Sequence, residues 1–423
     1  MRAAGRRDRD AGRGLLCADE ERQSGACVPP DQGRRVVASG NAAVIAGIGQ
    51  TEFSKNSGRS ELQLACEAIK AALDDAGLEP ADIDGMSTFT LDNNEDIDIV
   101  RSMGIENLRF SSRSPHGGGG SIGTLAHAMA AVCSGLANVV VCYRAMNERS
   151  EARFGIAHLE PNSNSTGSGS GFLEWSMPYG AMTPAAWTGV QAQRYMHKYG
   201  VTNEDFAPVS VQIRQNAATN PLAWFFEKPI TIDDHQNSRW IVEPIFRLLD
   251  CCQESDGGVA ILVTTEERAQ DLRQKPAKIA HATQAVPFET ETVTDFYHHD
   301  LTLFDSGIQC AKDLYERTGI GPTDIQVGML YDHFTIAVFW HLEANGFCKP
   351  GEAADFVSDG HLALGGSIPL SPNGGLIGEA YIHGMNLVTE AVRQIRGTAT
   401  NQIEDVENVL LSAGMSGAIL SQC

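Results

Sequence analysis

The sequence lacks the features that mark several broad classes of protein. None of its 10 cysteines forms a Cys-x-x-Cys pair, so a zinc ribbon or a thioredoxin-like redox site is not indicated. No apolar run approaches the roughly 20 residues that a membrane span needs. Positive charge is scarce: the net charge is −21 at pH 7, which argues against nucleic acid as a partner. We therefore expect a cytoplasmic protein whose cysteines are mostly small buried side chains.

The 423 residues are enough for two or three packed units. Residues 1–40 differ from the rest, because they combine many arginines and acids with glycine and proline and show no apolar periodicity. They predict a disordered N-terminal extension. The alternative is that translation starts near Val36 or Val37. In either case we expect the fold to begin near Ala42.

One segment of the chain occurs twice, 242 residues apart. Residues 76–84 read Ala-Gly-Leu-Glu-Pro-Ala-Asp-Ile-Asp, and residues 318–326 read Thr-Gly-Ile-Gly-Pro-Thr-Asp-Ile-Gln. Each copy follows a helical pattern and precedes a short apolar run that predicts a strand, 85–89 and 327–331. A repeat of this length indicates a duplicated domain rather than a solenoid.

Each half then continues with a glycine-rich turn, a helix and a strand. In the first half these are 117–120, 122–134 and 138–143, and in the second half 374–375, 385–395 and 408–413. Alternating strands and helices predict two mostly parallel sheets with helices on their faces. We expect an N-terminal half at 41–270 and a C-terminal half at 271–423.

A long insertion, residues 144–245, interrupts the N-terminal half. It contains a stretch rich in Gly, Ser and Asn at 161–171 and four tryptophans: Trp175, Trp187, Trp224 and Trp240. This composition predicts a lid or a partner-binding region. The alternative is that the tryptophans pack a small core of the insertion itself.

Two tyrosine motifs lie in the C-terminal half. Residues 331–335 read Tyr-Asp-His-Phe-Thr, and residues 374–384 read Gly-Gly-Leu-Ile-Gly-Glu-Ala-Tyr-Ile-His-Gly. The second motif resembles a catalytic loop of the thiolase superfamily, in which Gly-Gly-Leu-Ile precedes Gly-His-Pro. The first aligns with the His-Asp-Cys-Phe motif of the branch related to sterol carrier protein thiolases. In this alignment Tyr381 stands where the family has a catalytic histidine.

The resemblance covers residues 42–423 and implies a thiolase fold. That fold is α/β, with duplicated βαβ halves forming a five-layer αβαβα core and an inserted loop or lid region. The family's nucleophilic cysteine falls at about Gly118 of this chain, and its second cysteine falls within 412–417, where there is none. The groups that covalent acyl transfer needs are therefore missing.

The same motifs resemble those of bacterial steroid side-chain aldolases. This resemblance implies a carbon–carbon lyase that cleaves a 17-hydroxysteroid side-chain CoA thioester by a retro-aldol reaction to a 17-ketosteroid and a short acyl-CoA, usually propionyl-CoA. Two alternatives stay open. One is an acyltransferase with an unconventional nucleophile such as Cys252 or Cys310, and the other is a non-catalytic protein that binds CoA esters or lipids.

A retro-aldol reaction needs a base for the hydroxyl proton and stabilisation and protonation of the enolate. Tyr331 and Tyr381 are the acid/base candidates, although a tyrosine at a strand end is usually a packed aromatic. Because a free phenol has a pKa of about 10, His333 and His383 are candidate tuners and Asp332 a candidate orienting group. Backbone N–H groups of the two glycine turns are predicted to bind substrate or an oxyanion: Gly117, Gly118, Gly119, Gly120, Gly374 and Gly375. The alternative for a glycine run is a flexible turn.

The resemblance also implies partners. We expect a homodimer through the thiolase core and a small OB-fold partner, often with a zinc ribbon, in a heterotetramer. No cofactor is expected beyond the CoA of the substrate. Residues 297–300 (Tyr-His-His-Asp) have metal-binding residue types without a companion cluster, so we expect no metal. His127 predicts a core histidine, and the absence of lysine from the three loops argues against a Schiff-base aldolase.

Overall fold

The computed structural model describes residues 42–151, 153, 177–288 and 298–423. The expected N-terminal extension at 1–40, the stretch 161–171 and Trp175 lie outside these residues. The chain from Asn41 onwards forms one compact unit. None of the helices in the described part of the chain has the length and apolar character to span a bilayer.

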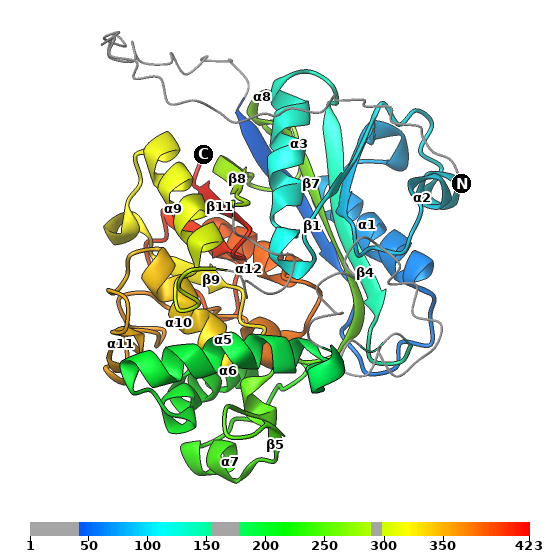
Figure 1. Cartoon of the computed structure of the whole chain (residues 1–423). Helices are drawn as coiled ribbons and strands as arrows, with labels where there is room; N and C mark the ends of the chain where they lie inside the picture. Colours follow the sequence, from blue (N-terminus) through cyan, green and yellow to red (C-terminus); the bar gives the residue numbers. More distant parts are fainter. Residues whose placement is uncertain (1–41, 152, 154–176, 289–297) are drawn as a thin grey trace, which may run out of the picture. The chain divides into compact units, whose positions relative to one another are not determined.

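A single nine-stranded sheet runs through both halves in the order β3-β2-β4-β7-β1-β8-β11-β10-β9 (Figure 1). The first half contributes β1 (Ala43–Gln50), β2 (Gly85–Phe89), β3 (Phe110–Ser114), β4 (Val139–Asn147) and β7 (Asp256–Thr265). The second half contributes β8 (Ala277–Gln284), β9 (Val327–Leu330), β10 (Asn408–Ser412) and β11 (Ser416–Ser421).

The sheet is mixed, so the prediction of two mostly parallel sheets is wrong. β2 pairs in parallel with β3 and β4, and β9 with β10, whereas the other neighbouring strands are antiparallel. Only three residues separate β10 from β11, and so short a connection permits antiparallel pairing alone. An antiparallel contact of β1 with β8, at Val44 and Ile45, joins the two halves.

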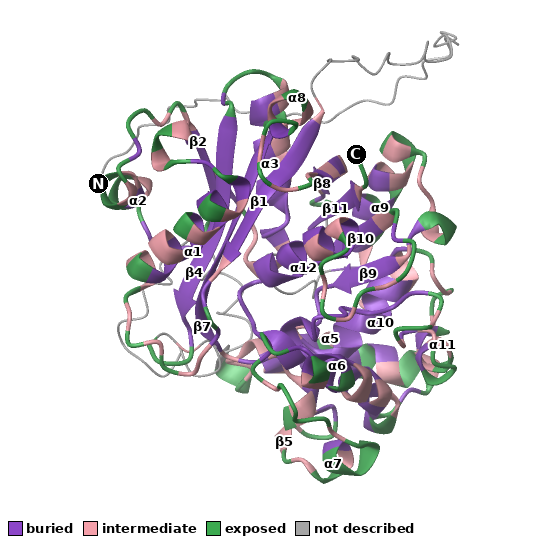
Figure 2. Cartoon of the chain, turned by 180° about the vertical axis from the view of Figure 1, so that it is seen from behind, coloured by how far each residue is buried: buried purple, intermediate pink, exposed green. Residues whose placement is uncertain are grey.

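The two halves of the sheet form two layers, and helices outside and between them form three more, as expected for five layers. On the first half, α1 (Glu61–Ala76) packs on β1, β4 and β7, with α2 (Asp96–Met103) beside it. On the second half, α9 (Asp305–Thr318) packs on β8 and β11, with α10 (Thr335–Ala344) beside it. Between the halves, α3 (Gly123–Cys133) and α12 (Met385–Arg396) contact strands of both. Figure 2 shows that α12 and the strands around it are buried.

The repeated segment has the same structure in both copies. Gly77 ends α1 with φ 76°, and Gly319 ends α9 with φ 73°, a left-handed conformation that glycine adopts without strain. A 3₁₀ turn follows each, Pro80–Asp82 and Pro322–Asp324, and leads into β2 or β9. The predicted duplication is confirmed at this level.

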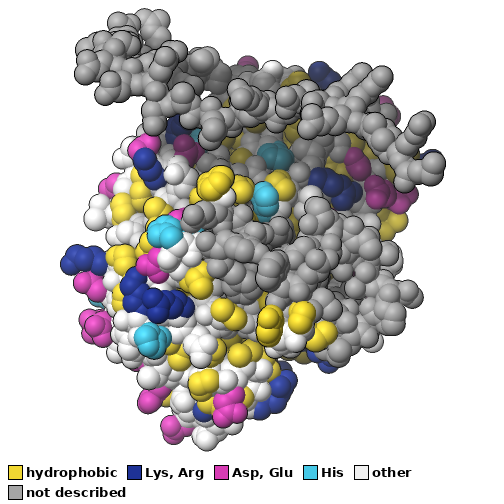
Figure 3. Space-filling view, in the orientation of Figure 1, with side chains coloured by type: hydrophobic (Ala, Val, Ile, Leu, Met, Phe, Trp, Pro, Cys, Tyr) yellow, Lys and Arg dark blue, Asp and Glu magenta, His cyan; other side chains and the backbone are white. Residues whose placement is uncertain are grey.

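The described part of the insertion is helical and packs on the second half. It contains α5 (Pro184–Tyr199), α6 (Ala207–Thr219), α7 (Ile232–Asn237) and β5 (Trp240–Val242), and β6 (Phe246–Arg247), which follows the insertion, pairs with β5. α6 contacts α10 and α11 (Ala353–Ser358), and the short α8 (Glu266–Ala269) follows β7. Acidic, basic and apolar side chains of the described residues are interspersed on the face in Figure 3.

A buried phenylalanine, not a tryptophan, joins the insertion to its surroundings. The Phe206 ring lies 6.2 Å from that of Phe246, just after the insertion, and 5.5 Å from that of Phe339 of α10. The described tryptophans of the insertion are half-buried or exposed: Trp187, Trp224 and Trp240. The alternative that tryptophans form the insertion's own core is therefore wrong for these three.

Candidate active site

Tyr331 and Tyr381 meet between the two halves. Tyr331 directly follows β9, and Tyr381 follows the buried turn 375–379. Their Oη atoms are 2.9 Å apart in a hydrogen bond, and their rings meet edge to face. Both side chains are buried. The two sequence motifs thus form one pair of phenols.

Burial raises the pKa of both phenols well above the usual value of 10. The two predicted tuners carry no charge near neutral pH. Burial lowers the pKa of His333 to about 4, and burial together with the positive charge of Arg144 lowers the pKa of His383 well below its usual value. Neither histidine supplies a positive field, so each can act on the phenols only as a neutral imidazole.

A buried ion pair of the first half, absent from the sequence interpretation, supports His383. Arg144 lies on β4, and its Nη1 is 3.1 Å from Oδ2 of Asp92. Its Nε donates to Nδ1 of His383 at 3.1 Å, which places the imidazole proton on Nε2. The ring of Phe89 lies 5.1 Å from the His383 ring and 5.3 Å from the guanidinium. The sequence contains one sign of Arg144: it directly follows the apolar run 139–143. The predicted strand ended at 143, whereas β4 continues for four more residues.

Gly118 makes room for the hydroxyl of Tyr331. A Cβ atom at Gly118 would lie 1.9 Å from Tyr331 Oη and 3.1 Å from Cδ2 of His383. Any side chain at 118, a nucleophilic cysteine included, would overlap the phenol. Gly120 is constrained as well, because its Cβ would lie 1.9 Å from the carbonyl oxygen of Pro115. The predicted glycine run therefore reaches the site, and it is tightly packed rather than a loose turn.

Asp332 holds the turn that leads to Tyr381. Its carboxylate accepts hydrogen bonds from the N–H groups of Leu376 and Ile377, at 2.9 and 3.1 Å. Gly375, with φ 55°, lies against it, since a Cβ there would be 2.5 Å from Asp332 Oδ2. Burial raises the pKa of Asp332 to about 7. The carboxylate positions the turn, as an orienting group would.

The amides of the second glycine pair are occupied within their own loop. Gly374 N–H donates to the carbonyl oxygen of Ser371 at 2.8 Å, and Gly375 N–H donates to Oδ1 of Asn373 at 3.1 Å. These two groups therefore shape the turn, and their predicted contact with an oxyanion is not supported.

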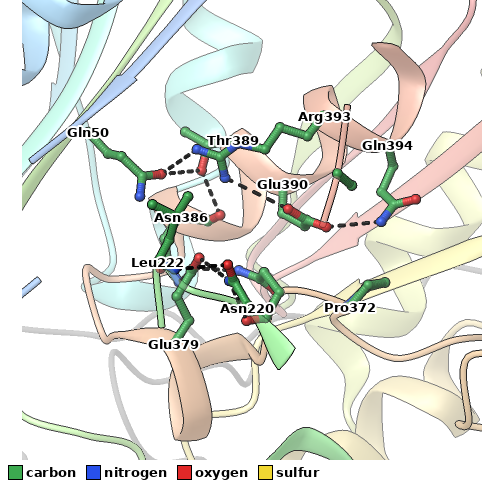
Figure 4. Close-up of polar contacts among 12 residues, drawn as sticks. Gln50, Asn220, Leu222, Pro372, Glu379, Asn386, Thr389, Glu390, Arg393 and Gln394 are labelled. Carbon is green, nitrogen blue, oxygen red and sulfur yellow. Dashed lines mark hydrogen bonds and ion pairs between the residues drawn. The ribbon is translucent and has the colours of Figure 1, made fainter. Parts of the chain in front are cut away.

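Glu379 fixes the other end of the same turn. Its buried carboxylate accepts hydrogen bonds from the side-chain amides of Asn220, Asn373 and Asn386. Figure 4 shows Asn220 and Asn386 on either side of it, from the end of α6 and from α12. Burial raises the pKa of Glu379 to about 7. The turn before Tyr381 is thus tied to the insertion and to the central layer.

A cavity of about 630 Å³ lies beside Tyr381. His333, Cys252 and Glu148 also line it, whereas Tyr331 is not part of its wall. Five cationic side chains surround it: Lys55, Arg149, Arg153, Arg214 and Arg239. Its volume lies in the range of small-molecule sites.

The cysteines considered as alternative nucleophiles are poorly suited to that role. Burial raises the pKa of Cys252 well above its usual value and that of Cys310 to about 12. Both are therefore thiols near neutral pH, and the thiolate is the nucleophilic form. Cys252 lines the cavity, but Cys310 lies on α9 in the outer layer.

One lysine does reach the cavity, although none lies in the three loops. Burial lowers the pKa of Lys55 to about 8, and its Nζ donates to Oε1 of Gln253 at 2.9 Å. Schiff-base catalysis would require an imine at the thioester carbonyl, where an amine instead displaces the thiol. Lys55 therefore fits ligand binding better than imine formation.

Two further histidine predictions have structural outcomes. His127 bonds to Ser112 Oγ at 3.2 Å and Gln284 Oε1 at 2.9 Å, so its hydrogen bonds are satisfied as expected, but it is half-buried and does not lie in the core. His298, His299 and Asp305 place possible ligand atoms within 4.8 Å of one another, which gives the histidines a companion that the sequence did not reveal. Both ring nitrogens of His298 already take part in hydrogen bonds, with Asp305 and with the Asp300 backbone.

Comparisons with known proteins show the family to which the chain belongs. The family model "Thiolase C-terminal domain-like" matches residues 289–423. A "Steroid side-chain-cleaving aldolase" of Thermomonospora curvata is 53% identical over 383 residues, covering 90% of this chain and 97% of the relative. A "17-hydroxy-3-oxo-4-pregnene-20-carboxyl-CoA lyase" of Mycobacterium tuberculosis is 50% identical over 388 residues, covering 90% and 99%.

The solved structure "Ltp2-ChsH2(DUF35) aldolase" superposes with a TM-score of 0.85 at 51% identity, covering 90% of this chain and 98% of that chain. The thiolase fold expected from the motifs is thus confirmed. The chain belongs to the thiolase superfamily and, within it, to the family of steroid side-chain-cleaving aldolases.

Proposed function

We propose that this protein is a carbon–carbon lyase that cleaves a 17-hydroxysteroid side-chain CoA thioester by a retro-aldol reaction. The products are a 17-ketosteroid and a short acyl-CoA, propionyl-CoA for a three-carbon side chain. Relatives at 53% and 50% identity over nine tenths of the chain support the substrate class. The observation that carries the mechanism is the buried Tyr331–Tyr381 pair, which fills the space that a nucleophilic thiol would need.

Tyr381 takes the hydroxyl proton, because it is the member of the pair that lines the cavity. The hydroxyl groups of Tyr331 and Tyr381 are hydrogen-bonded where Gly118 leaves room, and once Tyr381 is a phenolate Tyr331 is the donor. The resting phenols are neutral, since burial raises the pKa of both. The reactive form is the minor one in which the pair shares a single proton. A phenolate whose parent phenol is so weak an acid is a strong base.

The first glycine run positions the tyrosine pair. Gly118 and Gly119 belong to the 3₁₀ turn 118–120 that precedes α3, and Gly118 lies against Tyr331. None of residues 117–120 is among the residues that line the cavity, so we do not assign their backbone N–H groups to the thioester oxygen. The role of the second glycine pair is to shape the turn that carries Tyr381.

The cationic wall of the cavity receives the CoA part of the substrate. Arg149 and Arg153 pair with Glu254, whereas Arg214 is buried and its Nε has no hydrogen-bonding partner among the described residues. Phosphate groups of CoA are acceptors that match such guanidinium groups.

The assembly is a homodimer through the thiolase core with a small OB-fold partner bound to it. Support comes from the similar solved structure, an aldolase whose name includes a DUF35 component. Co-expression with such a partner should raise soluble yield or activity. A lone chain that is soluble and fully active would count against this part of the proposal.

The decisive experiment is product analysis with a 17-hydroxysteroid-CoA whose side chain has three carbons. The wild type should release the 17-ketone and propionyl-CoA, and Tyr381→Phe should lower kcat by roughly 10²- to 10⁴-fold. Tyr315→Phe is the matched control, because the Tyr315 hydroxyl bonds to the backbone oxygen of Asn345 in the outer layer. Wild-type activity should also survive thiol alkylation. Loss on alkylation would favour an acyltransferase, and full activity of Tyr381→Phe would contradict the catalytic role.

A further inference from the structure

Glu148 is a buried carboxyl group in the cavity wall that neither the sequence motifs nor the phenol pair account for. It directly follows β4, and only 4% of its surface is exposed. It lines the same cavity as Tyr381 and Cys252. Its Oε2 atom is buried and has no hydrogen-bonding partner among the described residues. A buried polar atom of this kind is rare in native proteins and needs an explanation.

Ser255 forms hydrogen bonds with both Glu148 and Tyr381. Its backbone forms a hydrogen bond with the Glu148 carboxyl group, and its hydroxyl accepts the backbone N–H of Tyr381 at 3.1 Å. The next residue, Asp256, begins β7 and accepts the backbone N–H of Arg149 at 2.9 Å. The Glu148 carboxyl group and the Tyr381 backbone are therefore both bound by Ser255, which directly precedes β7.

The surroundings of Glu148 favour its protonated form. Burial raises its pKa well above the usual value, and the negative charge of Glu254 adds to this effect. The positive charges of Arg144 and Lys55 act in the opposite direction. Burial thus favours the protonated carboxyl group, which can give its proton to a basic carbon.

We propose that Glu148 is the acid that delivers a proton to the α-carbon of the thioester enolate. This inference rests on the proposed function and concerns the second half of the same reaction. The tyrosine pair serves the hydroxyl oxygen, and the α-carbon lies two bonds away from that atom on the substrate. A second proton donor in the cavity wall completes the site.

The retro-aldol step begins at the hydroxyl group of the substrate. The O–H proton passes to the tyrosine pair while the bond between the carbinol carbon and the α-carbon breaks. Its electron pair becomes the thioester enolate, and the carbinol carbon becomes the ketone. The enolate carbon then forms a C–H bond with the Glu148 proton and leaves a carboxylate. The tyrosine pair loses its extra proton to solvent and the carboxylate regains one from solvent, so nothing is consumed.

Exchange of the α-hydrogens of propionyl-CoA in D₂O tests this assignment, because it needs the group that serves the carbon and not the base that serves the hydroxyl. With 17-ketosteroid present, the wild type should exchange these hydrogens. Glu148→Gln should lower exchange by roughly 10²-fold or more, and Tyr381→Phe should lose cleavage while keeping exchange. Glu151→Gln, an exposed carboxylate on the same segment, is the control and should match the wild type in both assays.

Thermal unfolding of each variant controls for folding. If Glu148→Gln is unstable, Glu148→Asp replaces it, because aspartate keeps the carboxyl group but is shorter by one methylene. Reduced exchange by a folded variant supports the assignment. A wild type that cleaves the steroid ester without exchange, or a Glu148→Gln variant that exchanges at the wild-type rate, overturns the role of Glu148 and leaves the proposed function standing. A wild type that does not cleave the ester overturns the proposed function itself.

Discussion

The two duplicated halves place an aromatic residue at the same point, and only one of the two carries a hydroxyl. Phe89 ends β2 and Tyr331 follows β9, each nine residues after the proline of the repeated segment. Both lie at the site, because Phe89 contacts the ring of His383 and Tyr331 bonds to Tyr381. The first half thus supplies an apolar wall and the buried Arg144, whereas the second half supplies the phenols.

Gly118→Cys places a thiol in the first half of the site and should have the largest effect. Gly118→Cys should lower lyase activity by about 10³-fold or more, because its Cβ would lie 1.9 Å from Tyr331 Oη. It should also lower the melting temperature and should not produce acyl transfer. Kinetics and thermal unfolding check this, with Gly365→Ala as control, since no atom lies near that Cβ position. Full lyase activity of Gly118→Cys would show that the phenol can move aside.

Tyr331→Phe makes the two halves equivalent at this position. We expect kcat to fall by about 10²-fold with little change in KM, because the ring stays and only the hydrogen bond to Tyr381 is lost. Steady-state kinetics of the folded variant measure the effect. A change confined to KM would instead assign Tyr331 to substrate binding.

Asp332→Asn tests whether burial raises the pKa of this second-half carboxyl group. Burial raises the native pKa of Asp332 from 3.8 to about 7, so between pH 4 and 7 the native state holds more protons than the unfolded chain. Its contribution to stability is therefore present at low pH and is lost as pH rises to 7, by at most about 4 kcal/mol. The asparagine variant should show a shallower fall of melting temperature across this range. Parallel curves for the two proteins would contradict the shift.

Phe89→Leu should have the smallest effect. The substitution keeps an apolar side chain but removes the edge-to-face contact with His383 and the ring beneath the Arg144 guanidinium. We expect a loss of about 1 kcal/mol in stability and a change in kcat of less than about tenfold. Melting temperature and kcat measure both. A loss as large as that of Tyr331→Phe would show that the first-half aromatic does more than support His383.

The parts of the fold that depend on local chemistry could be predicted from the sequence. The duplication was visible because Gly77 and Gly319 end helices at equivalent places and a proline-led turn follows each. The mixed pairing of the sheet was not visible, because apolar runs such as 258–264 do not show the direction of the neighbouring strand. The contact of β1 with β8 depends on how the halves pack.

Some residues of the candidate site could be predicted from the sequence, and others could not. Tyr331 and Tyr381 could be predicted because their motifs resemble the catalytic loops of the thiolase superfamily. Arg144 and Glu148 were missed because each is a single charged residue near the end of a strand, where most charges are solvated. Only tertiary structure shows that both are buried and that Ser255 bonds to Glu148 and to the backbone of Tyr381.

The contact between Gly118 and Tyr331 also restricts how such a site can arise from an acyl-transferring ancestor. A cysteine at 118 and this tyrosine occupy overlapping space, so a single chain cannot keep the old nucleophile while it acquires the new phenol. Residue 118 has to become glycine before the tyrosine fits.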